Sequence, residues 1–223
     1  MPFERTPLKE YPAYQAPTTS QEGAIIVNTT ALAESGLPMP QSFKDLAKPE
    51  YAGQVSVPDV NASSTAWLMV QAILEAYGET EGKEVMAGII QNAGPHYESS
   101  GSGPLKKVRA GEVAVAFGLR HQAVADKQDG LPIDYVDPAE GTYSLTESVA
   151  VIDKGDNINP LAMEMAACII QKGRPLLLET YPVPVYEGET ANEEMISKNS
   201  KEYPEPLTVD LLEEHKQFVE ECK

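Results

Sequence analysis

The chain has 223 residues, of which 42% are hydrophobic and 23% are charged, and it carries a formal net charge of −17. A chain of this length forms one large domain or two small ones around a buried core. The excess of acidic side chains argues against a nucleic-acid or anionic-membrane partner, because both require clustered Lys and Arg. No apolar run approaches membrane-spanning length, and the first five residues lack the basic and apolar character of a signal segment.

Short strands and helices alternate along most of the chain. Four prolines among polar residues make residues 1–22 an extended, poorly ordered lead-in. The pattern then predicts, in chain order, a strand over 24–28, a helix over 42–47, a strand over 54–58, helices over 65–77 and 81–92, a short helix ending at Gly111, a strand over 112–118, a helix over 120–129, strands over 133–136 and 145–152, a helix over 159–171, a loop over 182–203 and a helix over 209–219. This alternation predicts an α/β fold with an at least partly parallel sheet.

A serine- and glycine-rich segment, Tyr97-Glu98-Ser99-Ser100-Gly101-Ser102-Gly103-Pro104, leads directly into one of these helices. Proline is favoured in the first helical turn, so the helix is expected to start between Ser102 and Pro104. Free backbone N–H groups at such a start attract anions, and the glycines allow a ligand to approach closely. An ordinary capped turn is the alternative interpretation.

A second segment of the same kind is Asn61-Ala62-Ser63-Ser64-Thr65-Ala66, between a predicted strand and the helix over 65–77. Ser63 or Ser64 is the expected N-cap, and no Glu or Gln follows to close a capping box. Open α/β sheets bind ligands where strands feed helix N-termini. We therefore expect Ser63, Ser64, Thr65, Ser100, Gly101 and Ser102 to face one oxyanion, such as a phosphate or phosphonate.

Arg120 and His121 follow the predicted buried strand over 112–118, at the end where ligand groups gather. Arg120 is a candidate for bidentate contact with the oxyanion, or else a surface residue at a helix start. His121 is either a ligand contact or a packing residue. A serine enzyme that uses Ser100 or Ser102 with His121 as its base is a weaker alternative, because no established catalytic motif is present.

The two cysteines and the histidines indicate no metal site and no cofactor. Cys168 lies in an apolar stretch and is expected to pack as a small buried hydrophobe. Cys222 lies at the C-terminus, and no metal-ligand spacing connects the two.

Several segments together resemble the type 2 solute-binding proteins of ABC importers, in the branch that includes ferric-ion and 2-aminoethylphosphonate binders. The resemblance covers residues 24–186 and rests on Gly36-Leu37-Pro38-x-Pro40-x-Ser42-Phe43-x-Asp45-Leu46-x-x-Pro49-Glu50-Tyr51-x-Gly53, Ser63-Ser64-Thr65-Ala66-Trp67, Ser100-Gly101-Ser102-Gly103-Pro104, Gly111-Glu112-Val113-Ala114-Val115, and Glu140-Gly141-Thr142 ahead of Ser148-Val149-Ala150-Val151.

This resemblance implies a periplasmic-binding-protein-like type 2 fold, with two α/β lobes joined by a hinge around the ligand. It also implies an extracytoplasmic location and the membrane subunits of an ABC importer as partners. Residues 54–144 would form the central ligand-binding lobe, and 23–53 with 145–223 a partial first lobe and the C-terminal helices. Family members are longer at the N-terminus, where half of the first lobe and the export signal lie, so the chain resembles the family without that half.

One departure from the family bears on the ligand. Ferric binders carry a tyrosine pair directly after the strand that matches 112–118, and this chain has Leu119-Arg120-His121-Gln122 there. Without the two phenolates a ferric ion loses hard anionic ligands, so a phosphonate is expected in preference to iron with a synergistic anion.

An aminophosphonate ligand would also need a carboxylate for its ammonium group, because an unpaired buried charge costs several kcal/mol. Glu147 is the expected partner and Glu140 the alternative, with ordinary surface acids as the plain interpretation of both. Tyr143 would line the apolar linker of the ligand. A protein that keeps the lobe and binds nothing is the remaining interpretation.

Overall fold

The computed structural model describes residues 5–223, which divide into two compact units. Unit 1 combines Met1–Gln21 with Leu145–Ile196, and unit 2 combines Glu22–Ser144 with Ser197–Lys223. The predicted domain bounds differ from this division. Residues 23–53 belong with the central unit because strand β1 pairs there, and residues 197–223 join it through the last helix.

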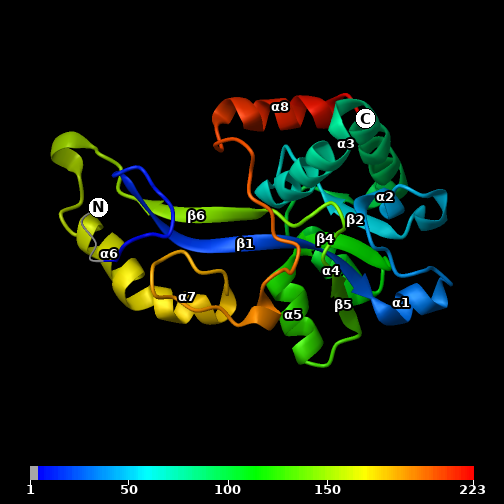
Figure 1. The fold of residues 1–223 in the computed structure, drawn as a ribbon, viewed down its shortest axis with the longest axis horizontal. Coiled ribbons are helices and arrows are strands. Elements are labelled where there is room, and N and C mark those ends of the chain that lie inside the picture. Colours follow the sequence, from blue (N-terminus) through cyan, green and yellow to red (C-terminus); the bar gives the residue numbers. More distant parts are fainter. Residues whose placement is uncertain (1–4) are drawn as a thin grey trace. The chain divides into compact units, whose positions relative to one another are not determined.

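A mixed β-sheet forms the centre of unit 2 (Figure 1), with the strand order β3-β2-β4-β1-β5 and with β6 paired to β1. The strands are β1 (Gln15–Asn28), β2 (Val55–Pro58), β3 (Tyr97–Glu98), β4 (Val115–Leu119), β5 (Ile133–Val136) and β6 (Ser144–Ala150). Strand β2 is parallel to β3 and β4, whereas β1 is antiparallel to β4 and β5. The carboxyl ends of β2, β3 and β4 therefore meet at one edge of the sheet.

Helices connect these strands and cover the sheet. They are α1 (Thr29–Glu34), α2 (Phe43–Leu46), α3 (Ser64–Ala93), α4 (Gly103–Ala110), α5 (Arg120–Gln128) and α8 (Val209–Glu220), with 3-10 turns at Pro49–Tyr51 and Gly94–His96. The two helices predicted over 65–77 and 81–92 are joined in α3, and the break between them falls at Gly78, whose φ of 66° is in the left-handed region. Gly111, with a φ of 70°, ends α4 as predicted.

The strands that were expected to be buried do form the core of unit 2. Val55, Val57, Val113, Val115 and Phe117 are fully or almost fully buried. Val136, at the end of the predicted strand over 133–136, is only half-buried, because β5 lies at the end of the sheet order.

Unit 1 contains the first half of β1, β6, the 3-10 turns Gly155–Asn157 and Glu193–Met195, and the helical run of α6 (Ala162–Cys168), a π-helical turn (Ile169–Gly173) and α7 (Arg174–Thr180). The lead-in predicted over 1–22 is shorter than expected, since β1 begins at Gln15 and continues through Pro17. Arg174 is fully buried and ion-paired to Glu189 at 2.9 Å. This pair connects α7 to the loop after it.

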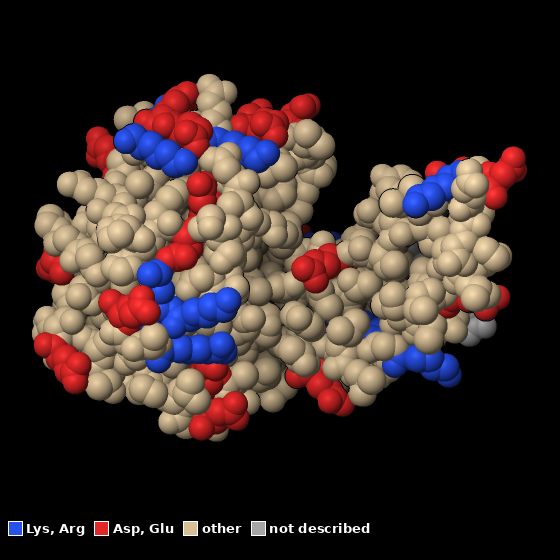
Figure 2. All heavy atoms as spheres, turned by 180° about the vertical axis from the view of Figure 1, so that it is seen from behind, with Lys and Arg blue, Asp and Glu red and all other residues tan. Residues whose placement is uncertain are grey.

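Charged side chains are interspersed on the surface. On the face that Figure 2 shows, basic side chains lie beside acidic ones and form no broad basic surface. No helix among residues 5–223 combines the length and apolar character needed to cross a lipid bilayer. The cysteines are unpaired, and Cys168 is exposed, so the prediction of a buried thiol is wrong. Only part of α6 is covered in unit 1, and Cys168 lies on its uncovered side.

Candidate functional site

Three helices of unit 2 start at the edge of the sheet where the parallel strands end. Strand β2 leads into α3, β3 leads into α4, and β4 leads directly into α5. Each helix start carries unpaired backbone N–H groups and the positive end of the helix dipole. This edge therefore gathers backbone N–H donors and the positive ends of three helix dipoles.

The start of α3 is built around Ser63, the N-cap residue. Its Oγ accepts a hydrogen bond from the Thr65 backbone N–H at 3.2 Å, and its own N–H donates to the Asp59 carbonyl at 2.9 Å. The prediction that Ser63 or Ser64 is the N-cap is therefore confirmed for Ser63, whose hydroxyl satisfies one amide of the first turn. The hydroxyls of Ser64 and Thr65 make no hydrogen bond to other described residues, and Ser64 is exposed.

The start of α4 is similar, with Ser102 at the N-cap and Pro104 in the first turn. The Ser102 side chain makes no capping hydrogen bond. Instead, Ser100 Oγ accepts from the Gly103 N–H at 3.1 Å. The sequence placed the helix start correctly, and the cap comes from a serine two residues earlier than the N-cap position.

The two helix starts are in direct contact through Gly101. A Cβ atom built on Gly101 would lie 2.5 Å from Ser63 Oγ and 2.7 Å from Thr65 Oγ1, so no larger residue fits without displacing them. The Asp59 N–H also donates to the Glu98 carbonyl at 2.8 Å, which joins the two loops at their base. The structure thus brings the two serine-rich segments together, and ligand binding by them stays a prediction.

A carboxylate also lies beside α4, which the sequence interpretation did not include. A Cβ on Gly103 would lie 2.7 Å from Glu98 Oε2, so the Glu98 side chain packs on the first turn of this helix. Lys107, one turn further along α4, is 3.4 Å from Glu98 Oε1. The Lys107 ammonium group offsets part of the negative charge that Glu98 brings to this side of α4.

Arg120 is placed differently from the prediction. Its side chain is buried, its Nε donates to Asp137 Oδ1 at 2.7 Å, and its guanidinium lies 4.6 Å from the centre of the Tyr135 ring. The guanidinium therefore links α5 to β5 and to the residues that follow β5. The carboxylate that it binds is Asp137 of this chain, in the place that the prediction gave to the ligand's oxyanion. His121 is buried beside Arg120, as a packing residue would be.

The three remaining predicted residues do not join the helix starts. Tyr143 is buried against the Tyr203 ring, with ring centres 5.1 Å apart, and burial raises the pKa of its phenol. Glu140 is buried and accepts from Tyr77 Oη and the Lys44 N–H, so it anchors α2. Glu147 lies in unit 1, is exposed, and accepts from Thr19 Oγ1 at 2.7 Å.

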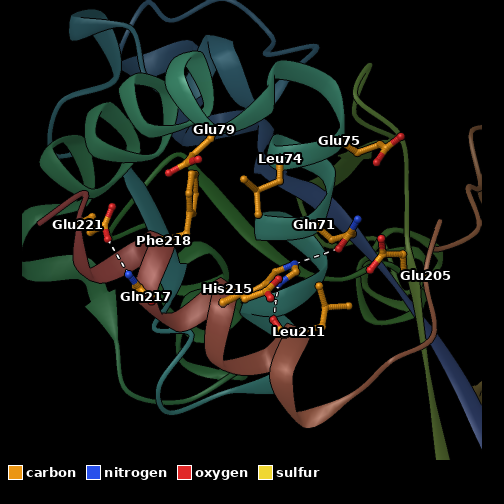
Figure 3. A pocket seen from close by; sticks show the side chains of 11 residues that line it. Gln71, Leu74, Glu75, Glu79, Glu205, Leu211, His215, Gln217, Phe218 and Glu221 are labelled. Atoms are coloured by element: carbon orange, nitrogen blue, oxygen red, sulfur yellow. Dashed lines mark hydrogen bonds between the residues drawn. The ribbon is translucent and has the colours of Figure 1, made fainter.

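A separate cavity of about 490 Å³ lies between α3 and α8 (Figure 3), and the amphipathic pattern of the last helix is the one sequence signal that pointed toward it. His215 from α8 and Gln71 from α3 meet there, with His215 Nε2 2.9 Å from Gln71 Oε1 and Nδ1 2.7 Å from the Leu211 carbonyl. Burial lowers the pKa of His215. Several glutamates line the cavity, and His215 and Gln71 use their polar atoms to hold the two helices together.

Among residues 5–223, no three His, Cys, Asp or Glu side chains are arranged to hold a metal ion. The donors at the helix starts of unit 2 are backbone N–H groups and hydroxyls, and a ligand site there stays a prediction. Such a site recognises a ligand by hydrogen bonding to its oxygen atoms.

The family of bacterial extracellular solute-binding proteins matches residues 3–192. The chain belongs to this family. The description of this family is of solute-binding proteins, which supports a binding role rather than catalysis by Ser100 and His121.

Solved structures confirm the α/β periplasmic-binding-protein fold. The periplasmic binding protein P5PA has a TM-score of 0.76 at 19% identity, over 93% of this chain and 67% of that one. AfuA from Actinobacillus pleuropneumoniae, with fructose-6-phosphate bound, has a TM-score of 0.72 at 21% identity, over 99% and 71%. Ferric iron-binding protein A from Mannheimia haemolytica has a TM-score of 0.65 at 20% identity, over 96% and 71%.

One relative is also similar to this chain in sequence. An uncharacterized protein of Haemophilus influenzae is 27% identical over 151 residues, which are 67% of this chain. The chain spans only 43% of that relative's length.

Proposed function

We propose that this chain is the extracytoplasmic solute-binding component of an ABC importer and that unit 2 binds a small oxyanion, 2-aminoethylphosphonate or a related phosphonate. The observation that supports the proposal is the contact of Gly101 with Ser63 and Thr65, which brings two helix N-termini together. The exposed Ser64 and Ser102 hydroxyls add donors that no other described residue uses.

The physical chemistry of this site favours an anionic oxygen ligand. Backbone N–H groups at the starts of α3 and α4 provide fixed donors, and both helix dipoles place positive charge at the same point. Hydroxyls can rotate to donate to whichever oxygen is nearest. A tetrahedral phosphonate presents three oxygens, so donors arriving from two helices can be satisfied at once.

Neighbours of known fold support the class of ligand without fixing it. AfuA carries a sugar phosphate, whose phosphoryl group offers the same tetrahedral oxygens as a phosphonate. Some solved relatives are ferric-ion binders, which keeps iron as the alternative. The segment Leu119-Arg120-His121-Gln122 offers no phenolate where the sequence resemblance implies a tyrosine pair in ferric binders, and the lack of these hard anionic ligands disfavours Fe³⁺.

The structure changes the roles proposed for the charged residues. Arg120 is proposed as a positioning residue, since Asp137 already occupies its guanidinium. For an ammonium group on the ligand, Glu147 stays a proposal from the sequence, and Glu98 is the carboxylate that unit 2 itself provides beside α4. Glu140 is removed from this role because Tyr77 and Lys44 hold it in the interior.

Isothermal titration calorimetry tests the proposal with 2-aminoethylphosphonate, methylphosphonate, fructose-6-phosphate, inorganic phosphate and ferric citrate as ligands. Ser64→Ala and Ser102→Ala should each weaken phosphonate binding by about 1–2 kcal/mol, or roughly 5- to 30-fold, through one lost hydrogen bond to a charged group. The matched control is Ser35→Ala, which removes another exposed serine of unit 2, at the end of α1. Binding of ferric ion with no response to any phosphonate would refute the phosphonate assignment.

A further inference from the structure

Asp59, the residue directly after β2, contacts both serine-rich segments of unit 2. Its Oδ1 accepts hydrogen bonds from the Asn61 N–H at 3.0 Å and from Asn61 Nδ2 at 3.3 Å. The same oxygen accepts from Tyr97 Oη at 3.1 Å. Asn61 opens the segment that leads into α3, and Tyr97 opens the segment that leads into α4. One carboxylate oxygen of Asp59 therefore fixes the first residue of each segment.

The backbone of Asp59 makes a second connection between the same segments. Its N–H donates to the Glu98 carbonyl at 2.8 Å, and its carbonyl accepts from the N–H groups of Ala62 at 3.0 Å and Ser63 at 2.9 Å. Ser63 is the N-cap of α3. The side chain and the backbone of Asp59 thus set the turn from β2 into α3 and, at the same time, the distance from that turn to β3.

The groups around the Asp59 carboxylate suit it as an acceptor. Burial and the neighbouring Asp59 carboxylate raise the pKa of Tyr97, so its phenol keeps its proton and is the donor. Hydrogen bonds to an ionised carboxylate are shorter and stronger than those between neutral groups. The Lys223 ammonium lies 3.8 Å from Asp59 Oδ2 and offsets part of the negative charge on that oxygen. Donors from two segments and one ammonium group thus surround the Asp59 carboxylate.

These contacts control how closely the two segments approach each other. The contact of Gly101 with Ser63 and Thr65 depends on this separation, because a Cβ on Gly101 would lie only 2.5 Å from Ser63 Oγ. Asp59 joins the segments where each leaves its strand. A carboxylate is unsuited to bind an oxyanion itself, because like charges repel. Its effect on the ligand is therefore exerted through the two segments.

We propose that Asp59 is the positioning residue of the oxyanion site and holds the starts of α3 and α4 close enough for donors of both helices to reach one ligand. The proposal rests on the proposed function of unit 2. It adds a residue that offers the ligand no donor but decides whether the donors of Ser64, Gly101 and Ser102 converge.

NMR of the chain tests this without a ligand, and calorimetry with 2-aminoethylphosphonate tests it with one. In the native chain we expect a nuclear Overhauser effect between Gly101 Hα and Thr65 Hβ, because a Cβ on Gly101 would lie 3.3 Å from Thr65 Cβ. Asp59→Ala should abolish this effect and weaken phosphonate binding at least tenfold, since several hydrogen bonds that join the segments are lost. Asp59→Asn keeps an acceptor oxygen and should retain the effect, with an affinity within about threefold of the native value.

Asp45→Ala is the matched control. The side chains of Asp45 and Asp59 are 22% and 23% exposed, and Asp45 Oδ2 accepts from the Gln41 N–H at 2.8 Å, so a comparable hydrogen bond is lost elsewhere in unit 2. This variant should lower Tm as Asp59→Ala does and leave the Overhauser effect and the affinity unchanged. Tyr97→Phe is the milder variant, for the case that Asp59→Ala does not fold. It removes one donor to Asp59 and should weaken the Overhauser effect and, by about threefold, phosphonate binding.

Four outcomes would overturn the proposal. They are an Overhauser effect that persists in Asp59→Ala, an equal loss of it in Asp45→Ala, an affinity of Asp59→Asn as low as that of Asp59→Ala, and a Tyr97→Phe protein that matches the native chain in both measurements. Absence of phosphonate binding by the native chain would instead refute the proposed function. In that case the Overhauser effect, which needs no ligand, still shows whether Asp59 holds the two segments together.

Discussion

Replacing Gly101 by alanine is the sharpest perturbation of the proposed site. The new Cβ would lie 2.5 Å from Ser63 Oγ and 2.7 Å from Thr65 Oγ1, closer than side-chain atoms approach one another. Both oxygens are one bond from Cβ on short side chains, so relief requires rotating them or separating the two loops. Either movement breaks the Ser63 cap on the Thr65 N–H.

The magnitude follows from these two consequences. Loss of an N-cap hydrogen bond costs about 1 kcal/mol, and forcing extra volume into a packed contact costs about 1–3 kcal/mol. Since part of this is the same event, we expect unit 2 to lose roughly 1–3 kcal/mol, which corresponds to about 3–10 °C in Tm for a chain of this size. Phosphonate affinity should fall at least tenfold, because donors on two helices no longer converge.

Fluorescence of Trp67 provides the stability assay, since it is the single tryptophan and lies buried in the first turn of α3. Gly173→Ala is the matched control. A Cβ at Gly173 meets no atom within 4 Å, and helical alanine is more stable than helical glycine by roughly 0.5–1 kcal/mol. A Gly101→Ala protein with unchanged Tm and unchanged affinity would refute the reasoning that the two helix starts form one site.

Three further predictions concern buried side chains that can carry a charge. Asp137→Ala removes the carboxylate that lies 2.7 Å from the buried Arg120 guanidinium and should destabilise unit 2 by about 3–5 kcal/mol in urea unfolding, and a loss below 1 kcal/mol would contradict the buried-pair interpretation. Burial acts to raise the pKa of Glu189, but hydrogen bonds from Arg174 and two backbone amides outweigh it and hold the pKa below 4.5. The stability that this ion pair contributes is therefore present above about pH 4.5 and is lost as pH falls through the lowered pKa. The loss of unfolding free energy between pH 5 and pH 3 should be smaller for Glu189→Gln than for the native chain, and an equal loss would contradict this. Burial lowers the pKa of His215, so its neutral ring stabilises the fold above pH 6.5, and this contribution declines as pH falls below that value. In urea unfolding, the free energy of unfolding should therefore fall more between pH 7.5 and pH 5.5 for the native chain than for His215→Gln. An equal fall in the two proteins would contradict this.

Local signals in the sequence predicted much of the fold that surrounds the site. Ser42 and Ser63 are N-caps as their sequence positions indicate, and Gly111 ends α4. These predictions succeed because caps and glycine turns depend on hydrogen bonds within a few residues. The coming together of two serine-rich segments could be predicted because parallel strands end at one edge of a sheet.

Contacts between distant segments were beyond the sequence. Nothing in the sequence near Arg120 indicates that its guanidinium binds Asp137, which comes later in the chain, after α5 and β5. Strand β1 extends back through Pro17 because β6 pairs with it, which overrides the local preference for an irregular lead-in. Cys168 is exposed because the helical run of unit 1 is covered on one side only, and apolar composition alone does not show which side.

The most direct test of the central claim is an NMR titration of the 15N-labelled chain with 2-aminoethylphosphonate, read at individual backbone amides. The account predicts that the largest chemical-shift changes fall on Ser64, Gly101 and Ser102 and saturate with one common affinity. Shifts that cluster around the cavity between α3 and α8, or no saturable shift at the two helix starts with any phosphonate or phosphate, would contradict it.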